Sequence, residues 1–457
     1  MTRHVSRNAG INVIGVILPT LVGIVSVPIL LANLGEARVG VFTLALGLMG
    51  FAGIFDLGLG RALTRTVAAA TGEGWRSEEI AYVVRRTLVI VTALGAVWGC
   101  ALWFAAKPLA TDAFVLGMPL TNEAISGIRW LAIAIPVLLL SSGTIGALEG
   151  LQRFTLVNAI RVPIGIATFL VPALTSFWYS DVGQVIAALV LVRISALLVW
   201  LPVLATVLPI TRHRSVERID TSGMWRFTGW LTVSNIVGPL MVMADRYYLA
   251  ILFPPSALAH YTVPLDTLVR GTALPVAAMN AVFPAFAHAG TDNTETERLV
   301  AGAGKALLVL WGLPICFIAL ALLPLLQSWV GADFAARSLP VTEWLLLGVL
   351  ANGFAHVPFA LLQSAGRSDI TGKLHIVELP LYAALLVTLT ATYGIVGAAI
   401  AWTARAGLDA LLLHALAWKQ FANLRRPIVT AAWSMILAAA ALLAIIVFWS
   451  NCCLLYT

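Results

Sequence analysis

Residues 398–418 read AAIAWTARAGLDALLLHALAW, an apolar run that contains Arg405 and Asp409 four residues apart. About 20 apolar residues in a row are enough to cross the hydrocarbon core of a bilayer as a helix. A single Arg or Asp at the membrane centre costs roughly 2.5 to 3.5 kcal/mol, so such a side chain normally faces a polar cavity or a partner. The stretch therefore predicts a membrane-spanning helix with a functional polar face.

The rest of the chain has the composition of a bilayer protein. Of its 457 residues, 60% are hydrophobic and 11% are charged, and the mean hydropathy is +0.95. A soluble globular domain has about 25% charged residues. The polar gaps between the apolar runs are all too short for a folded domain, which needs at least about 50 residues. We therefore expect any function to reside in the membrane bundle itself.

Hydropathy predicts an all-α, polytopic membrane protein with about 12 to 14 transmembrane helices. Thirteen apolar runs are read as spans, and each is long enough to cross a bilayer as a helix. The predicted spans are residues 11–32, 39–60, 86–105, 127–148, 157–178, 182–208, 224–252, 258–287, 300–326, 340–363, 373–393, 395–418 and 428–449.

The positions of the basic residues predict the orientation. With the N-terminus in the cytoplasm, the external gaps hold only Arg38, Lys107 and Arg337 of the 28 Lys and Arg residues. This bias is the positive-inside pattern of membrane proteins. Most of the other basic residues are scattered over many short loops rather than gathered in one patch, which argues against a nucleic-acid partner.

Two segments in corresponding places of the chain look alike. LANLGEARVGVFT at 31–43 and LAILFPPSALAHYT at 249–262 share Leu-Ala-x-Leu and, later, an aromatic residue followed by Thr. Each segment joins the first span of a six-span set to the second span of that set. The corresponding spans cross the membrane in the same direction, which predicts a parallel repeat related by a pseudo-two-fold axis. The predicted organisation is a six-helix lobe at 1–208, a cytoplasmic inter-lobe loop at 209–223, a second six-helix lobe at 224–418, and an extra span and tail at 419–457.

Several motifs carry a resemblance to a known family. They are the Asn-containing entry (Asn8, Asn12), the turn LGEARVG and the exit FDLGLGRALTR in the first half, followed by ADRYYLAILFPPSALAHYTVPLD at 244–266 and AVFPAFAHA at 281–289. Together they resemble oligosaccharide flippases of the polysaccharide-transporter family, which has an Asp in the seventh span, a Tyr after the external turn and a Pro near the end of the eighth span. The chain departs from that family in its thirteen spans, where twelve or fourteen are usual.

The resemblance implies membership of the multidrug/oligosaccharidyl-lipid/polysaccharide (MOP) exporter superfamily, with two six-helix lobes facing each other. It implies a transporter rather than an enzyme, in the bacterial cytoplasmic (inner) membrane. The implied cargo is an undecaprenyl-pyrophosphate-linked oligosaccharide (an O-antigen, capsule or exopolysaccharide unit), moved from the inner to the outer leaflet. Membrane lipids and other glycan-assembly membrane proteins are the further partners we expect.

Three arginines lie deepest in the predicted spans: Arg193, Arg270 and Arg405. At 1.5 Å per residue, Arg193 lies roughly 16 Å from the external end of its span. The guanidinium group keeps its charge at physiological pH, and its planar fork suits diphosphate oxygens. We predict that these three arginines bind the pyrophosphate and glycan in a central cavity, with the two lobes alternating in their access to the two sides.

Three aspartates also lie in predicted spans: Asp266 and Asp409 in the spans of Arg270 and Arg405, and Asp245 nearer the end of the span 224–252. Asp266 and Asp409 lie four residues from Arg270 and Arg405, so each pair shares one helix face. They are predicted to act as arginine partners or to carry a coupling H⁺ or Na⁺. Mutual neutralisation that only aids packing stays open as the alternative. No cofactor and no metal site are expected, because the four cysteines lack metal-ligand spacing.

Asp56, Arg61 and Arg65 lie at the cytoplasmic end of the second predicted span. Arg61 and Arg65 are four residues apart in the start of an interfacial helix, where they could bind lipid phosphates. We predict a cytoplasmic gate or lipid-phosphate site here, and positive-inside anchoring explains the two arginines equally well.

Two other functions are weighed against a flippase. A cation-coupled multidrug exporter of the same superfamily would favour an acidic, aromatic cavity for cationic cargo, whereas this chain has deep arginines. A membrane-embedded glycan polymerase or ligase would be expected to carry a large external loop with catalytic residues, and the external gaps are too short. No catalytic residue is therefore assigned.

Overall fold

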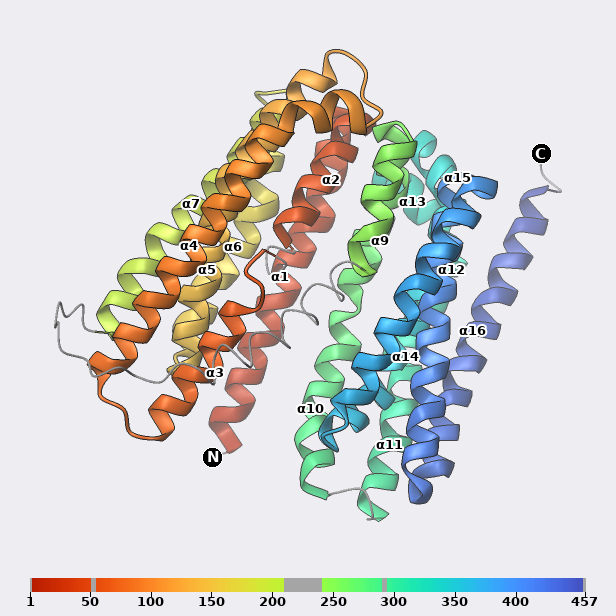
Figure 1. The fold of residues 1–457 in the computed structure, drawn as a ribbon. Helices are drawn as coiled ribbons and strands as arrows, with labels where there is room; N and C mark the ends of the chain where they lie inside the picture. Colours follow the sequence, from red (N-terminus) through yellow and green to blue (C-terminus); the bar gives the residue numbers. More distant parts are fainter. Residues whose placement is uncertain (1, 51–54, 209–240, 290–293, 455–457) are drawn as a thin grey trace. The chain divides into compact units, whose positions relative to one another are not determined.

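The computed structural model describes residues 2–50, 55–208, 241–289 and 294–454, and within these ranges the chain is helical with no strand (Figure 1). The all-α prediction is confirmed. Eight helices in these ranges are long and apolar enough to cross a membrane. The contacts divide the chain into two compact units, Met1–Ala259 and His260–Thr457, which are described separately below. The predicted inter-lobe loop 209–223 lies outside the described residues, so the predicted lobe boundaries stay a prediction.

Unit 1 is built around α5, which packs against α3, α4 and α7, while α6 packs against α1 and α7 (Figure 1). Its core gathers large apolar side chains such as Leu63, Leu148 and Trp200, each at most 2% exposed. The helices are α1 Thr2–Leu34, α2 Glu36–Gly50, α3 Leu59–Gly72, α4 Ser77–Pro108, the π-helical turn η2 Leu109–Ala113, α5 Leu120–Gly150, α6 Phe154–Thr175 and α7 Val182–Val207, followed by the helical residues 241–252.

The two look-alike segments both form abrupt junctions between helices. In the first, α1 ends at Leu34 and α2 begins at Glu36, with Gly35 in the left-handed region at φ 79°. In the second, a helix ends at residue 252 and α9 begins at Pro255. Gly40 lies against the carbonyl of Pro255, and a side chain at Gly40 would collide with that oxygen. The repeat itself stays a prediction.

A carboxylate joins the beginnings of three helices in unit 1. Arg38 of α2 donates two hydrogen bonds to Glu123 of α5, from Nε to Oε2 at 2.7 Å and from Nη2 to Oε1 at 2.6 Å. The backbone N–H of Val182, at the start of α7, donates to Glu123 Oε2 at 3.1 Å. The Glu123 side chain is only 11% exposed. Because Arg–carboxylate pairs in this bidentate geometry are the strong ones, this contact fixes how α2, α5 and α7 meet.

We expect Glu123→Ala to lower the free energy of unfolding by about 1 to 3 kcal/mol, since it removes a charge-assisted pair and leaves a backbone donor unsatisfied. Thermal unfolding of the purified, detergent-solubilised protein measures this. Glu149→Ala is the matched control, because its pair with Arg161 (2.6 Å) is more exposed and such pairs contribute below about 1 kcal/mol. Equal midpoints for the two variants would contradict the role given to Glu123.

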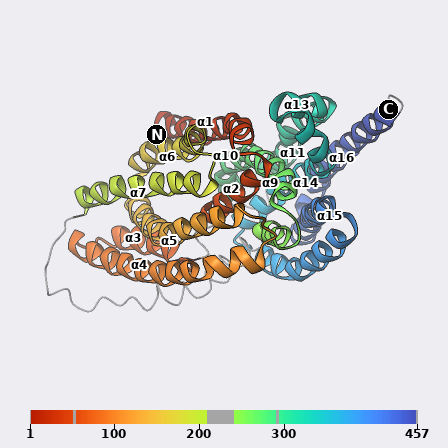
Figure 2. The same cartoon turned by 90° about the horizontal axis from the view of Figure 1, so that it is seen from above.

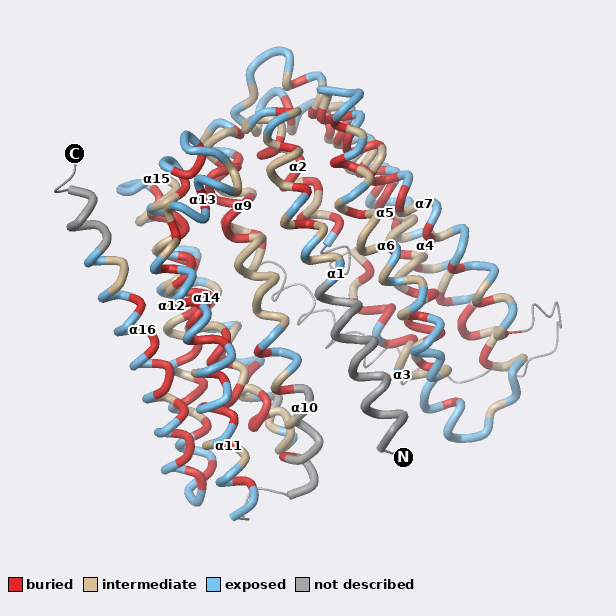
Figure 3. The backbone as a smooth tube through the Cα atoms, turned by 180° about the vertical axis from the view of Figure 1, so that it is seen from behind, coloured by how far each residue is buried: buried red, intermediate tan, exposed pale blue. Residues whose placement is uncertain are grey.

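Unit 2 is organised around α14, which is buried along most of its length and packs against α10, α13, α15 and α16 (Figure 2). By contrast, few residues of α4 and α6 in unit 1 are buried, and the rest are intermediate or exposed (Figure 3). Large apolar side chains such as Phe104, Phe317 and Val377 are among the exposed ones, as lipid-facing positions require. The helices are α9 Pro255–Gly271, α10 Ala273–Ala289, α11 Thr294–Leu307, η3 Leu308–Gly312, α12 Leu313–Leu320, α13 Leu322–Val330, α14 Ala332–Ser364, α15 Ser368–Gln420, η4 Ala422–Leu424 and α16 Arg425–Leu454.

The long element α15 is a helical hairpin rather than one straight helix. Gly394 breaks it, with φ 61° and ψ −140°, between the predicted spans 373–393 and 395–418. Gly397 lies directly against the carbonyl of Leu389, eight residues earlier, so the two halves run back along each other. A positive φ at this turn suits glycine, which has no Cβ to clash. The hairpin places residues of the first half opposite residues of the second.

Candidate functional site

Arg193 lies near the middle of α7 in unit 1, as the sequence predicted. Its side chain is partly buried, and its Nε is buried without a hydrogen-bond partner. In the part of the chain that the structure describes, Arg193 has no carboxylate in salt-bridge contact. A buried cation without a partner is costly, so this position suits a residue that receives an anion from outside the protein.

Arg405 lies in the second half of α15 and is held by aromatic rings. Its guanidinium carbon lies 5.6 Å from the ring centre of Tyr382 and 5.8 Å from that of Trp402. Its Nε is buried and has no hydrogen-bond partner among the described residues. Arg405 shares a helix face with Asp409, yet the two form no salt bridge in the described structure. The cation–π contacts orient the guanidinium without occupying its N–H donors.

Asp409 pairs across the hairpin instead. Its Oδ1 lies 3.6 Å from His375 Nε2 of the first half of α15, an ion-pair contact longer than a hydrogen bond. Glu378, one turn from His375, is 2% exposed, and both of its carboxylate oxygens lack a hydrogen-bond partner among the described residues. One side-chain N or O atom from each of His375, Glu378 and Asp409 lies within 4.8 Å of the other two. We call these three residues the hairpin cluster.

The hairpin cluster contains two residues that the sequence analysis did not assign to the site. His375 and Glu378 lie near the end of their predicted span, where an ionisable residue is usually interfacial. The residue numbers could have predicted this pairing, because residues equally far from the turn of a helical hairpin lie opposite each other. Around a turn near residue 393, positions 375 and 409 face each other, and so do 382 and 402. Reading the two spans as an antiparallel hairpin would have brought His375 to Asp409.

Arg270 and Asp266 lie in α9, and Asp245 lies in the helical residues 241–252. Asp266 and Arg270 are both partly buried in α9, four residues apart, with Arg270 in the last turn. Asp245 is fully buried, and its Oδ1 accepts a hydrogen bond from the backbone N–H of Arg246 at 2.8 Å. The roles assigned to these residues stay predictions.

The Asp56 carboxylate accepts hydrogen bonds within unit 1. Its Oδ1 accepts a hydrogen bond from the N–H of Gly58 at 2.7 Å, and its Oδ2 accepts one from Ser142 Oγ at 3.2 Å. The carboxylate thereby holds the turn before α3 against α5. Arg61 and Arg65 are exposed on one face of α3, whose opposite face is buried. An amphipathic helix with two exposed arginines can lie at a lipid headgroup surface, and the gate role stays a prediction.

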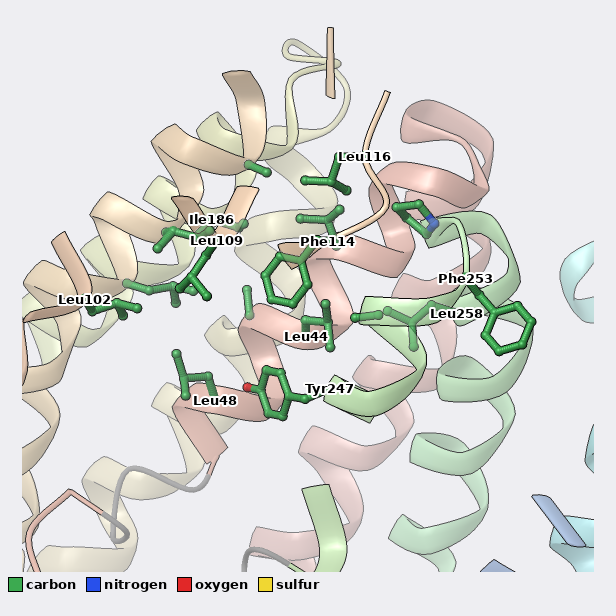
Figure 4. A pocket seen from close by; sticks show the side chains of 17 residues that line it. Leu44, Leu48, Leu102, Leu109, Phe114, Leu116, Ile186, Tyr247, Phe253 and Leu258 are labelled. Carbon is green, nitrogen blue, oxygen red and sulfur yellow. The ribbon is translucent and has the colours of Figure 1, made fainter. Parts of the chain in front are cut away.

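Unit 1 also contains an apolar cavity of about 210 Å³, lined by α2, η2, α5, α7 and residues 247–258 (Figure 4). Leu44, Leu48 and Phe114 point into it, and Tyr247 also lines it. The Tyr247 hydroxyl lacks a hydrogen-bond partner among the described residues. The cavity can take an apolar group and offers little to a charged one.

Comparison with known proteins assigns the chain to a family. The family described as "Polysaccharide biosynthesis protein" matches residues 5–289, more than half of the chain. The chain belongs to this family. A relative from Shigella flexneri, named "Putative O-antigen transporter", is 30% identical over 419 residues, which are 89% of this chain and 96% of the relative.

Solved structures establish the fold of this family member. An inward-facing multidrug resistance MATE family transporter of the MOP superfamily matches with a TM-score of 0.72, at 15% identity, over 91% of this chain and 99% of that one. The lipid II flippase MurJ, in an inward closed conformation, matches with a TM-score of 0.70, at 11% identity, over 96% of this chain and 97% of that one. The chain therefore has the fold of these transporters. This fold, together with the family and the 30% identical relative, supports a multi-pass membrane transporter rather than an enzyme.

Proposed function

We propose that this transporter moves an undecaprenyl-pyrophosphate-linked oligosaccharide from the inner to the outer leaflet of the bacterial cytoplasmic membrane. The oligosaccharide is an O-antigen, capsule or exopolysaccharide unit. The two units alternate in exposing a cationic site to the two sides, with the N-terminus in the cytoplasm. The polyprenyl tail stays in lipid while the pyrophosphate and glycan pass through the protein.

The name of the 30% identical relative supports this cargo class, since O-antigen is a glycan. The name of MurJ supports a lipid-linked substrate, because its cargo is lipid II. The positive-inside distribution of Lys and Arg supports the orientation. Other glycan-assembly membrane proteins are proposed as partners on the same grounds, since the glycan must be supplied on one side and consumed on the other.

The proposal rests mainly on two arginines at mid-span depth whose hydrogen-bond donors are not used within the described structure. Arg193 in unit 1 and Arg405 in unit 2 each have a buried Nε without a hydrogen-bond partner among the described residues. Each unit therefore holds a guanidinium with open donors at mid-span depth. Pyrophosphate oxygens accept bidentate bonds from such groups, and the resulting charge-assisted contacts are the strong class of hydrogen bond. We propose Arg270 as a third contact.

A bacterial strain that lacks its own flippase, and therefore its surface glycan, tests the proposal in cells. We expect the wild-type chain to restore the surface glycan, detected by antibody or lectin, and Arg193→Ala with Arg405→Ala to abolish restoration at equal protein level. Arg367→Ala is a control, since Arg367 is a solvent-accessible partner of Asp369. Restoration by the double variant would count against a pyrophosphate site at these arginines.

One observation favours a second function, the coupled export of cationic small molecules. Glu378 and Asp409 place two buried carboxylates in unit 2, as a cationic cargo would require. A competition experiment separates the two functions, using binding of a fluorescent cationic dye to the purified protein. Saturable binding of the dye that other cationic compounds displace would favour this second function, whereas we expect a flippase to bind undecaprenyl pyrophosphate and no such dye.

A further inference from the structure

The hairpin cluster holds an excess of negative charge in a buried place. Glu378 and Asp409 are 2% and 7% exposed. His375 and Arg405 are the neighbours that act on them electrostatically, and His356 of α14 acts on Asp409 from outside the hairpin. Two carboxylates against one guanidinium leave one negative charge uncompensated if the histidines are neutral. Such a charge in a low-dielectric site is costly, so the cluster requires one more cation.

The second observation is that Glu378 is unsatisfied. Both of its oxygens are buried and lack hydrogen-bond partners among the described residues, although Asp409 and His375 lie beside it. A buried carboxylate normally has several acceptor positions filled. The open positions of Glu378 are where a shared proton would be placed, between this carboxylate and the other members of the cluster.

The third observation concerns Arg405. It lies one helical turn from Asp409, but it rests over the rings of Tyr382 and Trp402 and not on either carboxylate. The arrangement is consistent with a cluster in which a proton supplies the missing positive charge. If that proton left, the nearest available cation for Glu378 and Asp409 would be the Arg405 guanidinium.

We propose that His375, Glu378 and Asp409 form a proton-binding site that controls whether Arg405 is free to bind the pyrophosphate of the cargo. With one proton bound, His375, Glu378, Asp409 and Arg405 together are neutral, and Arg405 keeps its donors open. When the proton leaves, the carboxylates draw the guanidinium to themselves and the pyrophosphate loses a contact. This inference rests on the proposed cargo for its second half, and the proton site itself does not depend on the cargo.

The chemistry of the cluster favours a proton over Na⁺. Na⁺ is a hard cation that prefers oxygen ligands, and one of the three groups here is an imidazole nitrogen. An imidazole beside a carboxylate is instead a pair that exchanges a proton near neutral pH. No bond other than O–H or N–H forms or breaks in this step, and the proton comes from water on one side of the membrane and leaves to the other.

The sign of the linkage follows directly. Because the proton-bound state keeps Arg405 open, the cargo binds that state more tightly, so its affinity should rise as the pH falls. For one coupled proton the affinity changes by up to about tenfold per pH unit within the titration range, and by reciprocity cargo binding takes up a proton. Glu378→Gln removes the excess charge and mimics the protonated state, so the pH dependence should disappear with the affinity kept high.

The first arm of the test needs no ligand. Infrared difference spectra of the full-length protein in nanodiscs, between acidic and alkaline pH, report the protonation of carboxyl and imidazole groups. We expect a carboxyl and a histidine signal that are altered in Glu378→Gln and in His375→Gln. Asp369→Asn is the matched control on the same hairpin, since Asp369 is exposed and pairs with Arg367 and Lys373. His356→Gln shows whether the proton belongs to the neighbouring histidine instead.

The second arm measures the affinity of undecaprenyl pyrophosphate as a function of pH for the wild type, Glu378→Gln and Asp369→Asn. The titration of the pyrophosphate itself is common to all three, so the difference between the wild type and Glu378→Gln isolates the cluster. We expect the affinity of the wild type and of Asp369→Asn to change with pH by the same amount, and we expect the affinity of Glu378→Gln to lack this additional pH dependence. Replacing K⁺ by Na⁺ at constant pH should leave all three unchanged.

The outcomes separate the two proposals. Infrared spectra that are identical in the wild type and the cluster variants would overturn the proton site, even if undecaprenyl pyrophosphate binds. A Na⁺ effect that Glu378→Gln abolishes would also overturn it, in favour of a metal cation. Failure of undecaprenyl pyrophosphate to bind at any pH would instead overturn the proposed cargo and the link to Arg405, while the infrared result alone decides the proton site.

Discussion

Arg405→Ala is expected to weaken the binding of undecaprenyl pyrophosphate by about 10- to 150-fold, and Arg193→Ala by a similar factor. A hydrogen bond to a charged group contributes about 1.5 to 3 kcal/mol, and 1.4 kcal/mol corresponds to about tenfold in affinity. Both side chains have a buried Nε with no hydrogen-bond partner among the described residues. Their removal should therefore cost ligand contacts and few protein contacts. Equilibrium binding to the purified protein in nanodiscs measures the effect.

Two controls distinguish a ligand contact from a packing contact. Arg405→Lys keeps the positive charge and loses the fork, so it should bind with intermediate affinity. Arg161→Ala removes an arginine whose partner is Glu149 at a more exposed position, and it should bind like the wild type. If Arg193→Ala and Arg405→Ala bound as tightly as Arg161→Ala, the arginines would be packing residues.

Gly397→Ala is expected to destabilise the α15 hairpin by about 1 to 3 kcal/mol or more. A Cβ at this position would overlap the backbone carbonyl of Leu389 on the other half of the hairpin, and a backbone atom cannot rotate away as a side chain can. Overpacking of a well-packed site costs about this much. The expected result is a lower thermal unfolding midpoint and a lower yield of folded protein, measured by size-exclusion chromatography in detergent.

The same half of the hairpin offers a matched control. Gly407→Ala adds the same methyl group ten residues later, where nothing lies within 4 Å of the new Cβ. In a helix interior, Ala is more favourable than Gly by roughly 0.5 to 1 kcal/mol, so this variant should be as stable as the wild type or more stable. Equal loss of stability in the two variants would contradict the close approach at Gly397.

The sequence was sufficient to predict the helical bilayer fold, because each span must bury its own backbone hydrogen bonds and therefore reads as a long apolar run. It was also sufficient to place the break at residue 394, where two such runs meet at a glycine. The depth of Arg193 and Arg405 could likewise be read from their distance to the span ends. These features depend on local composition alone.

Side-chain partners could not be predicted in the same way. Arg405 and Asp409 share a helix face, so spacing pairs them, but in the structure Arg405 lies over aromatic rings and Asp409 contacts His375. That choice depends on which residues the hairpin brings opposite each other. The place of Asp56 at the end of its span could likewise be read from the sequence, but its hydrogen bonds with Gly58 and Ser142 could not. Residue spacing predicts which side chains share a helix face, whereas their contact partners depend on how the helices pack.

Transbilayer movement of a labelled undecaprenyl-pyrophosphate-linked sugar in reconstituted vesicles tests the central claim most directly. The measurement is the fraction of label that becomes accessible in the opposite leaflet, compared with vesicles that contain the Arg193→Ala, Arg405→Ala double variant. We predict rapid loss of the leaflet asymmetry with the wild type, faster under an imposed proton gradient, and slow loss with the double variant. An asymmetry that persists with the wild type under H⁺ and Na⁺ gradients of either direction would contradict the flippase assignment.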